Sequence, residues 1–475
     1  MSAAFEIAGL DAVGQADLVR RGDVSAVELV TWAIERIHAL NPTLNAVVTP
    51  IFDRALERAA GVSAGPLAGV PYLLKDLATE MEGVPFSEGS RFLRHYVSRY
   101  DSELVRRLQR AGLIILGKTN TPEFGMVPTC EPVLWGPTRN PWDTARSTSG
   151  SSGGSAAAVA SSMVPAAHGN DLGGSIRFPA SACGLFGLKP TRARNPLGPE
   201  YGDVIGGWAV EHALTRSVRD SAALLDATHG AAPGDPYPAP PVARPFAMEV
   251  GVDPGKLRIA YSPRTPDGAL GHPDSVAALE DAVALCASLG HEMVEADLPG
   301  LTPRIGAAIG RVYDAATAWI VQYWIERIGR EPGEDELEPI TRAYWESGRR
   351  KSAGDYLQAV EELQRFSHCV AQFLSRFDMW LTPTMSAPPP LLGEVAANPE
   401  VGARTVAYPA VVANITGNPA MSVPLWWSTA GLPMGVHFLG RFGDETTLFR
   451  LASQLEAARP WQGHVPAVSA RYLGA

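Results

Sequence analysis

Apolar and polar positions recur with two different periods along this chain, and together they predict helices and strands. Residues 25–42, SAVELVTWAIERIHALNP, place apolar residues at helical intervals after Ser25 and Glu28, which have the spacing of a capping box. We expect this helix to end at the Asn-Pro pair. Residues 102–110 predict a second helix that stops at the following glycine, and the short apolar runs 70–74 and 113–117 predict buried strands.

The same mixture continues toward the C-terminus. KLRIAYSP, DSVAALEDAVALCASLGH and HEMVEADLP predict a strand, a helix and a strand, further helical stretches lie between residues 302 and 377, and a strand-and-helix region ends the chain. A proline-rich stretch at 232–246 either links two domains or runs over the surface. Helices and strands that alternate in this way are typical of an α/β fold.

Composition and charge narrow the class of protein. The chain has 475 residues, of which 46% are hydrophobic and 19% charged, as in globular proteins, and its formal net charge is -10. Without a run of lysine and arginine, we expect neither nucleic acid nor a membrane surface as a partner. The start of the chain lacks the pattern of a signal peptide, and the four cysteines form no CxxC pair. We therefore expect a cytoplasmic protein without a metal site, a disulfide framework or a membrane span.

Two glycine- and serine-rich clusters carry the candidate chemistry, STSGSSGGSAAAVASS at 147–162 and GNDLGGSIR at 169–177. Neither has the spacing of a phosphate-binding loop. Ser152 matches the GxSxG nucleophile elbow of α/β-hydrolases, although RNPWDTARSTS, which is no apolar strand, precedes it. Ser175 is the second candidate. The thiol of Cys183 lies in the apolar segment PASACGLFGL and is expected to be packing.

A serine hydroxyl needs a base within hydrogen-bonding distance to become a nucleophile. His168 and His437 are candidates by residue type, but nothing in the sequence ties either to an orienting carboxylate. Lys75 is the other candidate, because it closes an apolar strand where its ammonium group would be poorly solvated. The residues alone leave the choice open.

A family resemblance covers nearly the whole chain. In order, GPLAGVPYLLKDL, LGKTNTPEF, RNPWD, SGSSGGSAAAVA, GNDLGGSIRFPASACGLFGLKPT, LTRSVRD, LTPT and NITGNPAMSVPL resemble the motifs of the amidase signature family. VPYLLKDL, TRNPW and HGND look most like bacterial amidases of the 6-aminohexanoate-cyclic-dimer hydrolase and aryl acylamidase type. The resemblance implies one α/β domain over 1–475, a large twisted mixed sheet covered by helices on both sides. Its catalytic core would span about 65–230, the stretch 232–246 would be a surface connection, and about 300–400 would form a variable helical pocket region.

The resemblance also implies a Ser-cisSer-Lys triad and no cofactor. Ser175 would be the nucleophile, Ser151 the bridging serine after a cis peptide bond, and Lys75 the base that receives the proton through Ser151. An ordinary lysine, with a pKa of about 10.4, is almost entirely charged at pH 7, so this base must be buried and neutral. We expect the oxyanion to be stabilised by the backbone N–H groups of Leu172, Gly173, Gly174 and Ser175.

Further residues complete the expected site. Asp171 and Arg177 flank the nucleophile with opposite charges and should form a structural ion pair, and Gly150 should relieve crowding beside Ser151. The substrate pocket is expected to include Gly125, Met126, Thr129, Ser149, Phe178 and Tyr313. Met126 lies where nylon-oligomer amidases resembling this chain carry an amide side chain, which predicts a more apolar pocket. The expected substrate is a neutral, fairly hydrophobic amide, with carbamates (urethanes) and esters accessible to the same acyl-enzyme chemistry.

Three other functions stay open at this point. The chain could be the glutamine-hydrolysing subunit of a tRNA-dependent amidotransferase, although Phe178 stands where that subunit typically has a glutamine. It could be an α/β-hydrolase-type esterase that uses Ser152. A non-catalytic binding protein is disfavoured because Lys75, Ser151 and Ser175 are all retained. A monomer or a homodimer is expected.

Overall fold

A single mixed sheet runs through the molecule, and its strands come from almost the entire chain. The computed structural model describes residues 7–62 and 64–473. The strand order is β1-β3-β2-β4-β6-β5-β10-β11-β9-β7-β8. Parallel pairs join β2 to β3 and β4, and β7 to β8 and β9, whereas the other neighbours are antiparallel. The strands are β1 Val47–Pro50, β2 Pro71–Lys75, β3 Ile114–Thr119, β4 Ala166–Asp171, β5 Phe186–Lys189, β6 Val210–Thr215, β7 Arg258–Tyr261, β8 Glu292–Glu295, β9 Met379–Pro383, β10 Ala420–Trp427 and β11 Pro433–Gly440.

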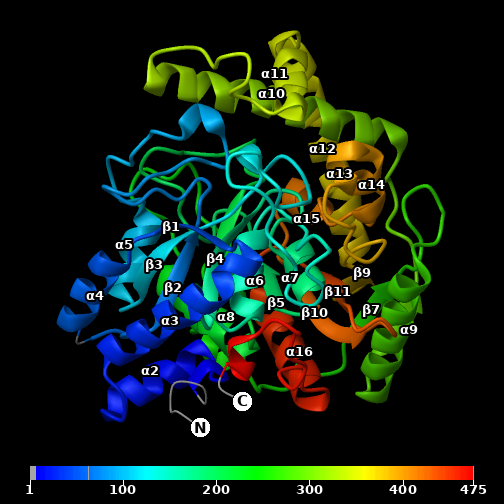
Figure 1. The fold of residues 1–475 in the computed structure, drawn as a ribbon. Helices are drawn as coiled ribbons and strands as arrows, with labels where there is room; N and C mark the ends of the chain where they lie inside the picture. Colours follow the sequence, from blue (N-terminus) through cyan, green and yellow to red (C-terminus); the bar gives the residue numbers. More distant parts are fainter. Residues whose placement is uncertain (1–6, 63, 474–475) are drawn as a thin grey trace.

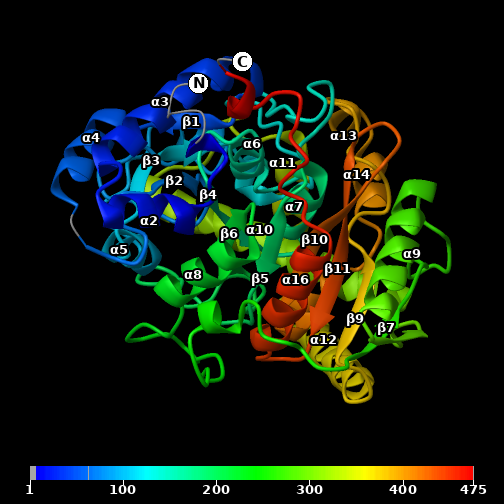
Figure 2. The same ribbon diagram turned by 90° about the horizontal axis from the view of Figure 1, so that it is seen from below.

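Helices cover both faces of this sheet (Figures 1 and 2). They are α2 Ala12–Arg21, α3 Ala26–Leu44, α4 Phe52–Gly61, α5 Glu103–Arg110, α6 Gly153–Ala160, α7 Arg177–Cys183, α8 Val218–Thr228, α9 Pro273–Ser288, α10 Pro303–Ile328, α11 Pro339–Arg349, α12 Ala353–Leu374, α13 Glu394–Ala397, α14 Pro399–Thr405, α15 Val412–Thr416 and α16 Glu445–Ala458. Figure 1 shows α10 and α11 extending across the top of the molecule, beyond one end of the strands. In the part of the chain that the structure describes, no helix combines the length and apolar character needed to cross a bilayer.

Strand alternation explains how both faces become buried. Successive side chains of a strand point to opposite faces. In β2, Leu73 packs into the apolar cluster that contains α3, α6 and α7, whereas Tyr72 and Leu74 pack into the cluster that contains α2 and α5. Lys75 shares the parity of Leu73, so the sequence of β2 directs its side chain toward α6 and α7. The candidate serines lie at the N-terminal ends of those two helices.

The elements predicted from the sequence are largely confirmed, but several boundaries differ: β2 and β3 each begin one residue later than predicted, and β3 ends two residues later, at Thr119. The capping box at Ser25 and Glu28 is present, but α3 continues past Pro42 to Leu44. A proline in the last turn removes only one helical N–H, and the N–H of Asn45 still closes the turn on the carbonyl of Asn41 at 2.8 Å. The proline-rich stretch 232–246 contains no helix or strand before Phe246, and most of its residues are exposed or half-buried.

Candidate active site

Lys75 is the last residue of β2, and its ionisable side chain is fully buried. Its Nζ lies 2.7 Å from Ser151 Oγ and 2.6 Å from Asn170 Oδ1. Burial lowers the pKa of the Lys75 ammonium to about 7, against the opposing effect of nearby carboxylates, of which Glu211 is the strongest. A substantial fraction of this amine is therefore neutral at physiological pH, which is the state that a general base requires.

Two further contacts fix the position of this amine. Asn170 donates from Nδ2 to the carbonyl of Leu77 at 3.0 Å, so its Oδ1 is held toward Lys75. With one N–H of the neutral amine donated to Asn170, the nitrogen lone pair is available to Ser151. Behind the strand, His168 Nδ1 accepts the backbone N–H of Lys75, and its Nε2 lies 2.5 Å from Glu211 Oε2. His168 therefore supports the lysine and contacts neither serine.

Ser151 lies in the loop before α6. The peptide bond between Gly150 and Ser151 is cis, as the family resemblance predicted. The side chain is almost fully buried, and its hydroxyl faces Lys75. Gly150 lies so close to the backbone of Thr129 that a Cβ would come within 2.4 Å of its carbonyl oxygen. A glycine is therefore required where the loop approaches Thr129.

Ser175 follows β4 and precedes α7, and it is half-buried. Its carbonyl accepts the N–H of Ser152 at 3.2 Å, which ties the two serine loops together. Among the described residues, no hydrogen bond joins the hydroxyls of Ser151 and Ser175. The side chain of Ser175 instead lines two cavities, so a substrate can reach its hydroxyl.

The backbone around Ser175 differs in one respect from the predicted oxyanion site. The N–H of Gly174 donates to Asp171 Oδ1 at 2.9 Å and so is not available to a substrate. The N–H groups of Leu172, Gly173 and Ser175 have no partner in the described structure. Gly174 has another role: its φ is +138°, and a Cβ would lie 2.2 Å from the ring of Phe178. Only glycine lets this turn pass beneath the Phe178 ring.

Asp171 and Arg177 form the predicted ion pair, with 2.9 Å between Nη2 and Oδ1 and both side chains fully buried. Burial alone would raise the pKa of Asp171, but Arg177 and the hydrogen bond from Asn414 outweigh it and hold the pKa well below its usual range. Asn414, from the NITGNP motif, also accepts from Arg177 at 2.7 Å. This three-residue network fixes the Ser175 loop against the C-terminal third of the chain.

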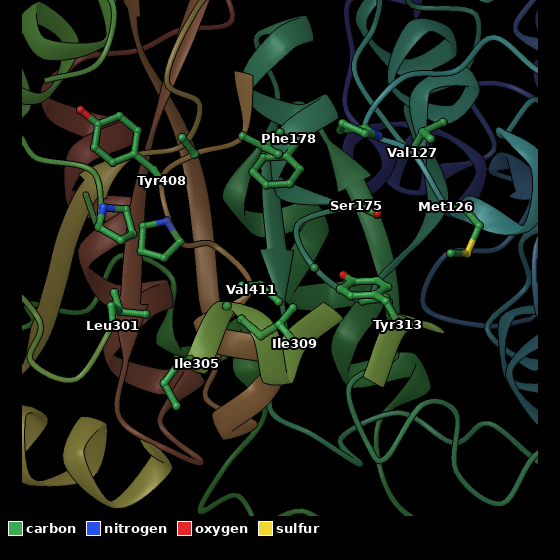
Figure 3. A pocket seen from close by; sticks show the side chains of 18 of the residues that line it. Met126, Val127, Ser175, Phe178, Leu301, Ile305, Ile309, Tyr313, Tyr408 and Val411 are labelled. Atoms are coloured by element: carbon green, nitrogen blue, oxygen red, sulfur yellow. The ribbon is translucent and has the colours of Figure 1, made fainter. Parts of the chain in front are cut away.

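A cavity of about 560 Å³ opens beside Ser175 and is mainly apolar in its lining. Figure 3 shows the rings of Phe178 and Tyr313 near Ser175, with Tyr408 and Leu301 farther along the cavity. Of the predicted pocket residues, Gly125, Met126, Phe178 and Tyr313 line it. The walls that the sequence did not single out come from Val127 and Pro128, the start of α10 and the segment Val406–Val411, and include Ile305, Ile309, Tyr408 and Val411.

Two predicted pocket residues lie elsewhere. Thr129 is buried, and its hydroxyl bonds to Glu131 and, at 2.8 Å, to Ser147 Oγ. Ser149 is buried as well and donates to the carbonyl of Pro128 at 3.2 Å. Both hydroxyls are used within the protein, because the loop turns them away from the cavity.

A second, smaller cavity of about 70 Å³ meets Ser175 from the other side. Ser151, Asn170, Glu88, Glu211 and Tyr201 line it, but none of them lines the larger cavity. Met126, Leu172 and Tyr313 line both and separate the two spaces around Ser175.

The other candidate nucleophiles and bases, Ser152, Cys183 and His437, are buried away from the two cavities or held in contacts within the protein. Ser152 is buried and donates to the carbonyl of Asn170 at 3.3 Å, and it lines neither of the two cavities. Burial raises the pKa of the Cys183 thiol, which disfavours the thiolate. His437 lies with Nε2 2.8 Å from Arg177 Nη1, inside the ion-pair network. In the described ranges, no three His, Cys, Asp or Glu side chains gather in a way that could hold a metal.

With this fold and site in view, comparison with known proteins places the chain in a class. The family model described as Amidase matches residues 28–449. The chain therefore belongs to the Amidase family, that of the amidase signature, and is a hydrolase of amide C–N bonds by that membership.

Individual relatives agree with this assignment. The chain is 39% identical over 477 residues to 6-aminohexanoate-cyclic-dimer hydrolase of Paenarthrobacter ureafaciens, covering 96% of each chain. A solved structure of 6-aminohexanoate cyclic dimer hydrolase superposes with a TM-score of 0.92 at 37% identity, covering 97% of this chain and 99% of that one. A bacterial aryl acylamidase superposes with a TM-score of 0.89 at 26% identity, covering 96% and 98%. The resemblance drawn from the motifs is confirmed.

Several site residues were not found from the sequence. Asn170 stands in the quoted motif GNDLGGSIR, but only its contact with Lys75 reveals its role. Glu88 and Tyr201 lie in segments without a catalytic motif, and they reach the site because the chain folds back over β2 and β4. In the sequence, Glu88 is marked only by the glycine that follows it in FSEGS, a pattern that does not predict its burial.

Proposed function

We propose that this protein hydrolyses apolar amides through an acyl-enzyme on Ser175, with Ser151 as proton relay and Lys75 as base. The observation that carries the proposal is the buried contact of 2.7 Å between Lys75 Nζ and Ser151 Oγ, beside a serine that opens into an apolar cavity. The Lys75 pKa of about 7 matches the requirement of a general base. Burial lowers the pKa of Lys189 to about 7 as well, but Lys189 donates to the carbonyl of Pro190, so the contact with Ser151 is what distinguishes Lys75.

These positions support the following proposed steps. As Ser175 Oγ attacks the carbonyl carbon, its proton passes to Ser151 Oγ, and the Ser151 proton passes to Lys75 Nζ. The N–H groups of Leu172, Gly173 and Ser175 stabilise the oxyanion. The C–N bond then breaks as Ser151 protonates the leaving nitrogen and recovers a proton from Lys75. Water repeats the sequence on the acyl-enzyme, releasing the carboxylic acid and restoring Ser175.

The lining of the larger cavity supports an uncharged, apolar acyl group. Phe178, Met126, Ile305 and Ile309 offer no charge to a substrate, and the charged side chain in the described lining, Asp267, is exposed to solvent. Apolar surface of this kind stabilises a bound hydrocarbon group by about 25 cal/mol per Å² buried. Carbamates and esters present the same carbonyl and a leaving group to Ser151, so we include urethanes and esters among the proposed substrates.

A substrate panel tests the proposal with the purified protein alone. We expect hydrolysis of anilides and aliphatic amides of apolar acids, and weaker hydrolysis of glutamine. Hydroxylamine should divert the acyl group to a hydroxamate, because it competes with water for the acyl-enzyme. Glutaminase activity that appeared only with partner subunits would favour the amidotransferase role, and inertness toward every acyl compound would favour a binding protein.

The pH dependence of turnover follows from Lys75. The neutral amine is the active form, so kcat/KM should fall as pH drops through about 7 and reach a plateau above it. The profile is measured with a neutral amide, and circular dichroism at each pH shows whether the protein stays folded. A rate that is independent of pH across this range would contradict Lys75 as the base.

A further inference from the structure

Both cavities that meet at Ser175 are mainly apolar in their lining, but only the smaller one also receives buried carboxyl groups, those of Glu88, Glu211 and Asp171. The larger one receives Gly150 and Gly173, together with the apolar residues of α7 and α10. The smaller one, about 70 Å³, receives Ser151 and Asn170 and is more enclosed. At about 15 Å³ for each water-sized group, the smaller cavity holds roughly five such groups. A substrate split at Ser175 can thus place a large part on one side and a short part on the other.

The position of Ser151, the proposed proton donor, decides which cavity takes the amine half of the substrate and which takes the acyl half. This argument rests on the proposed function, in which Ser151 protonates the leaving nitrogen. Ser151 lines the smaller cavity and not the larger one. A nitrogen within hydrogen-bonding distance of Ser151 therefore carries its substituent into the smaller cavity. The acyl half then fills the larger, apolar cavity, and the apolar character argued above applies to that half.

Polar groups line the smaller cavity away from the triad. Glu88 is buried, with φ of +48°, and its carboxyl accepts from Trp324 Nε1 at 2.9 Å and from the Ala78 N–H at 3.2 Å. The two oxygens therefore act as acceptors and are held in place. Tyr201 is 4% exposed, lines the same cavity, and has a hydroxyl without a hydrogen-bond partner in the described structure.

These groups are unexplained by amide cleavage alone. A buried hydroxyl without a partner costs about 1–3 kcal/mol. Both oxygens of Glu88 accept from uncharged donors, so what this buried carboxyl lacks in its ionised form is a cation. Burial raises the pKa of Glu88 to about 8, although the Trp324 hydrogen bond opposes this, so an approaching cation would favour the ionised form. Within this mainly apolar lining, Glu88 and Glu211 are acidic groups, Asp171 is paired with Arg177, and Lys75 is the nearby cation.

We infer that the smaller cavity is a leaving-group subsite that selects short amines carrying a second, basic group at their far end, with Glu88 as the specificity-determining acceptor and Tyr201 as its neighbour. A chain of four carbons ending in an ammonium group matches the space. The amides favoured by this subsite are mono-acylated short diamines. Hydrolysis of the ammonium-bearing amide by one water releases the diamine, with both nitrogens protonated, and the carboxylate.

A matched pair of substrates tests the subsite. N-(4-aminobutyl)hexanamide and N-pentylhexanamide have the same acyl group and the same number of heavy atoms in the amine half. We expect kcat/KM at pH 8 to favour the aminobutyl amide about tenfold or more, since a hydrogen bond to a charged group is worth about 1.5–3 kcal/mol. Equal rates for the two amides, or faster hydrolysis of the pentyl amide, would overturn the subsite while leaving the proposed function intact.

Substitutions test which residues cause the preference for the aminobutyl amide over the pentyl amide. Glu88→Gln should reduce the ratio to about one, and Tyr201→Phe should lower it about threefold. Glu123→Gln is the matched control, because Glu123 is also a buried glutamate bonded to a serine and a backbone N–H but lines neither cavity. A ratio that is unchanged in Glu88→Gln, or lowered equally in Glu123→Gln, would remove Glu88 from the proposal.

A binding measurement distinguishes failure of the proposed subsite from failure of the proposed hydrolysis. Calorimetric titration with 1,4-diaminobutane and with pentylamine probes the cavity without turnover. The subsite is supported if the diamine binds more tightly than pentylamine and if Glu88→Gln abolishes this difference. This holds even if neither amide is cleaved, in which case only the proposed hydrolysis fails. Binding of the diamine no tighter than that of pentylamine contradicts the subsite directly.

Discussion

Replacing Ser175 by alanine is expected to lower kcat/KM for an apolar anilide by at least about 10⁴-fold, because it removes the atom that forms the acyl-enzyme. The protein should fold normally, since the hydroxyl of Ser175 makes no hydrogen bond to Ser151 that the substitution would break. The measurement is steady-state hydrolysis, together with mass spectrometry of the protein during turnover. The wild-type protein should gain the mass of the acyl group and the variant should not.

Ser152→Ala is the matched control for this experiment. Ser152 is a buried serine of the neighbouring loop, and its hydroxyl donates only to the carbonyl of Asn170. We expect this variant to retain turnover within about tenfold of wild type, because loss of the Ser152 hydroxyl removes a single buried hydrogen bond. Near-normal activity of Ser175→Ala with loss in Ser152→Ala would transfer the nucleophile to Ser152 and restore the esterase alternative.

Replacing Lys75 by methionine is expected to lower kcat/KM by about 10³-fold or more, because Ser151 then has no acceptor for its proton. Methionine fills the same buried space without an amine. The residual rate should lose the fall below pH 7 that the wild type is expected to show. This change of profile distinguishes loss of the base from loss of structure.

Lys118→Met provides the comparison. Lys118 is a fully buried lysine of the adjacent strand β3, its Nζ donates to the carbonyl of Thr79 at 2.5 Å, and burial lowers its pKa as well. It lines neither cavity, so its loss should alter the midpoint of urea unfolding more than the pH profile of kcat/KM. An unaltered profile in Lys75→Met would contradict the assigned base.

The sequence predicts those parts of the site that are set by local pattern. The apolar strand ending in Lys75 and the glycine-flanked Ser175 are contiguous motifs, and strand alternation then directs Lys75 toward the two serine loops. The cavity walls depend instead on tertiary packing of distant segments. Tyr408 and Ile305 have no sequence feature that distinguishes them from ordinary core residues. Their place beside Ser175 is set by how α10 crosses the end of the sheet.

The errors have the same origin. Thr129 and Ser149 are polar residues next to the motifs, and proximity in sequence suggested that they face the substrate. Their hydroxyls are bonded to neighbouring loop residues, an outcome that only the backbone path determines. The N–H of Gly174 is predicted to donate to the oxyanion, but in the structure it donates to the carboxylate of Asp171.

The bonds from Asn414 to Asp171 and Arg177 have a consequence for the timing of activity during protein synthesis. The loop that holds the nucleophile takes its shape only when a segment more than two hundred residues later in the chain has been made and packed against it. Until then the charges of Asp171 and Arg177 lack their third partner. We therefore expect a nascent chain that has not yet reached Asn414 to be inert toward amides, and the proposed hydrolysis to begin only with the nearly complete protein.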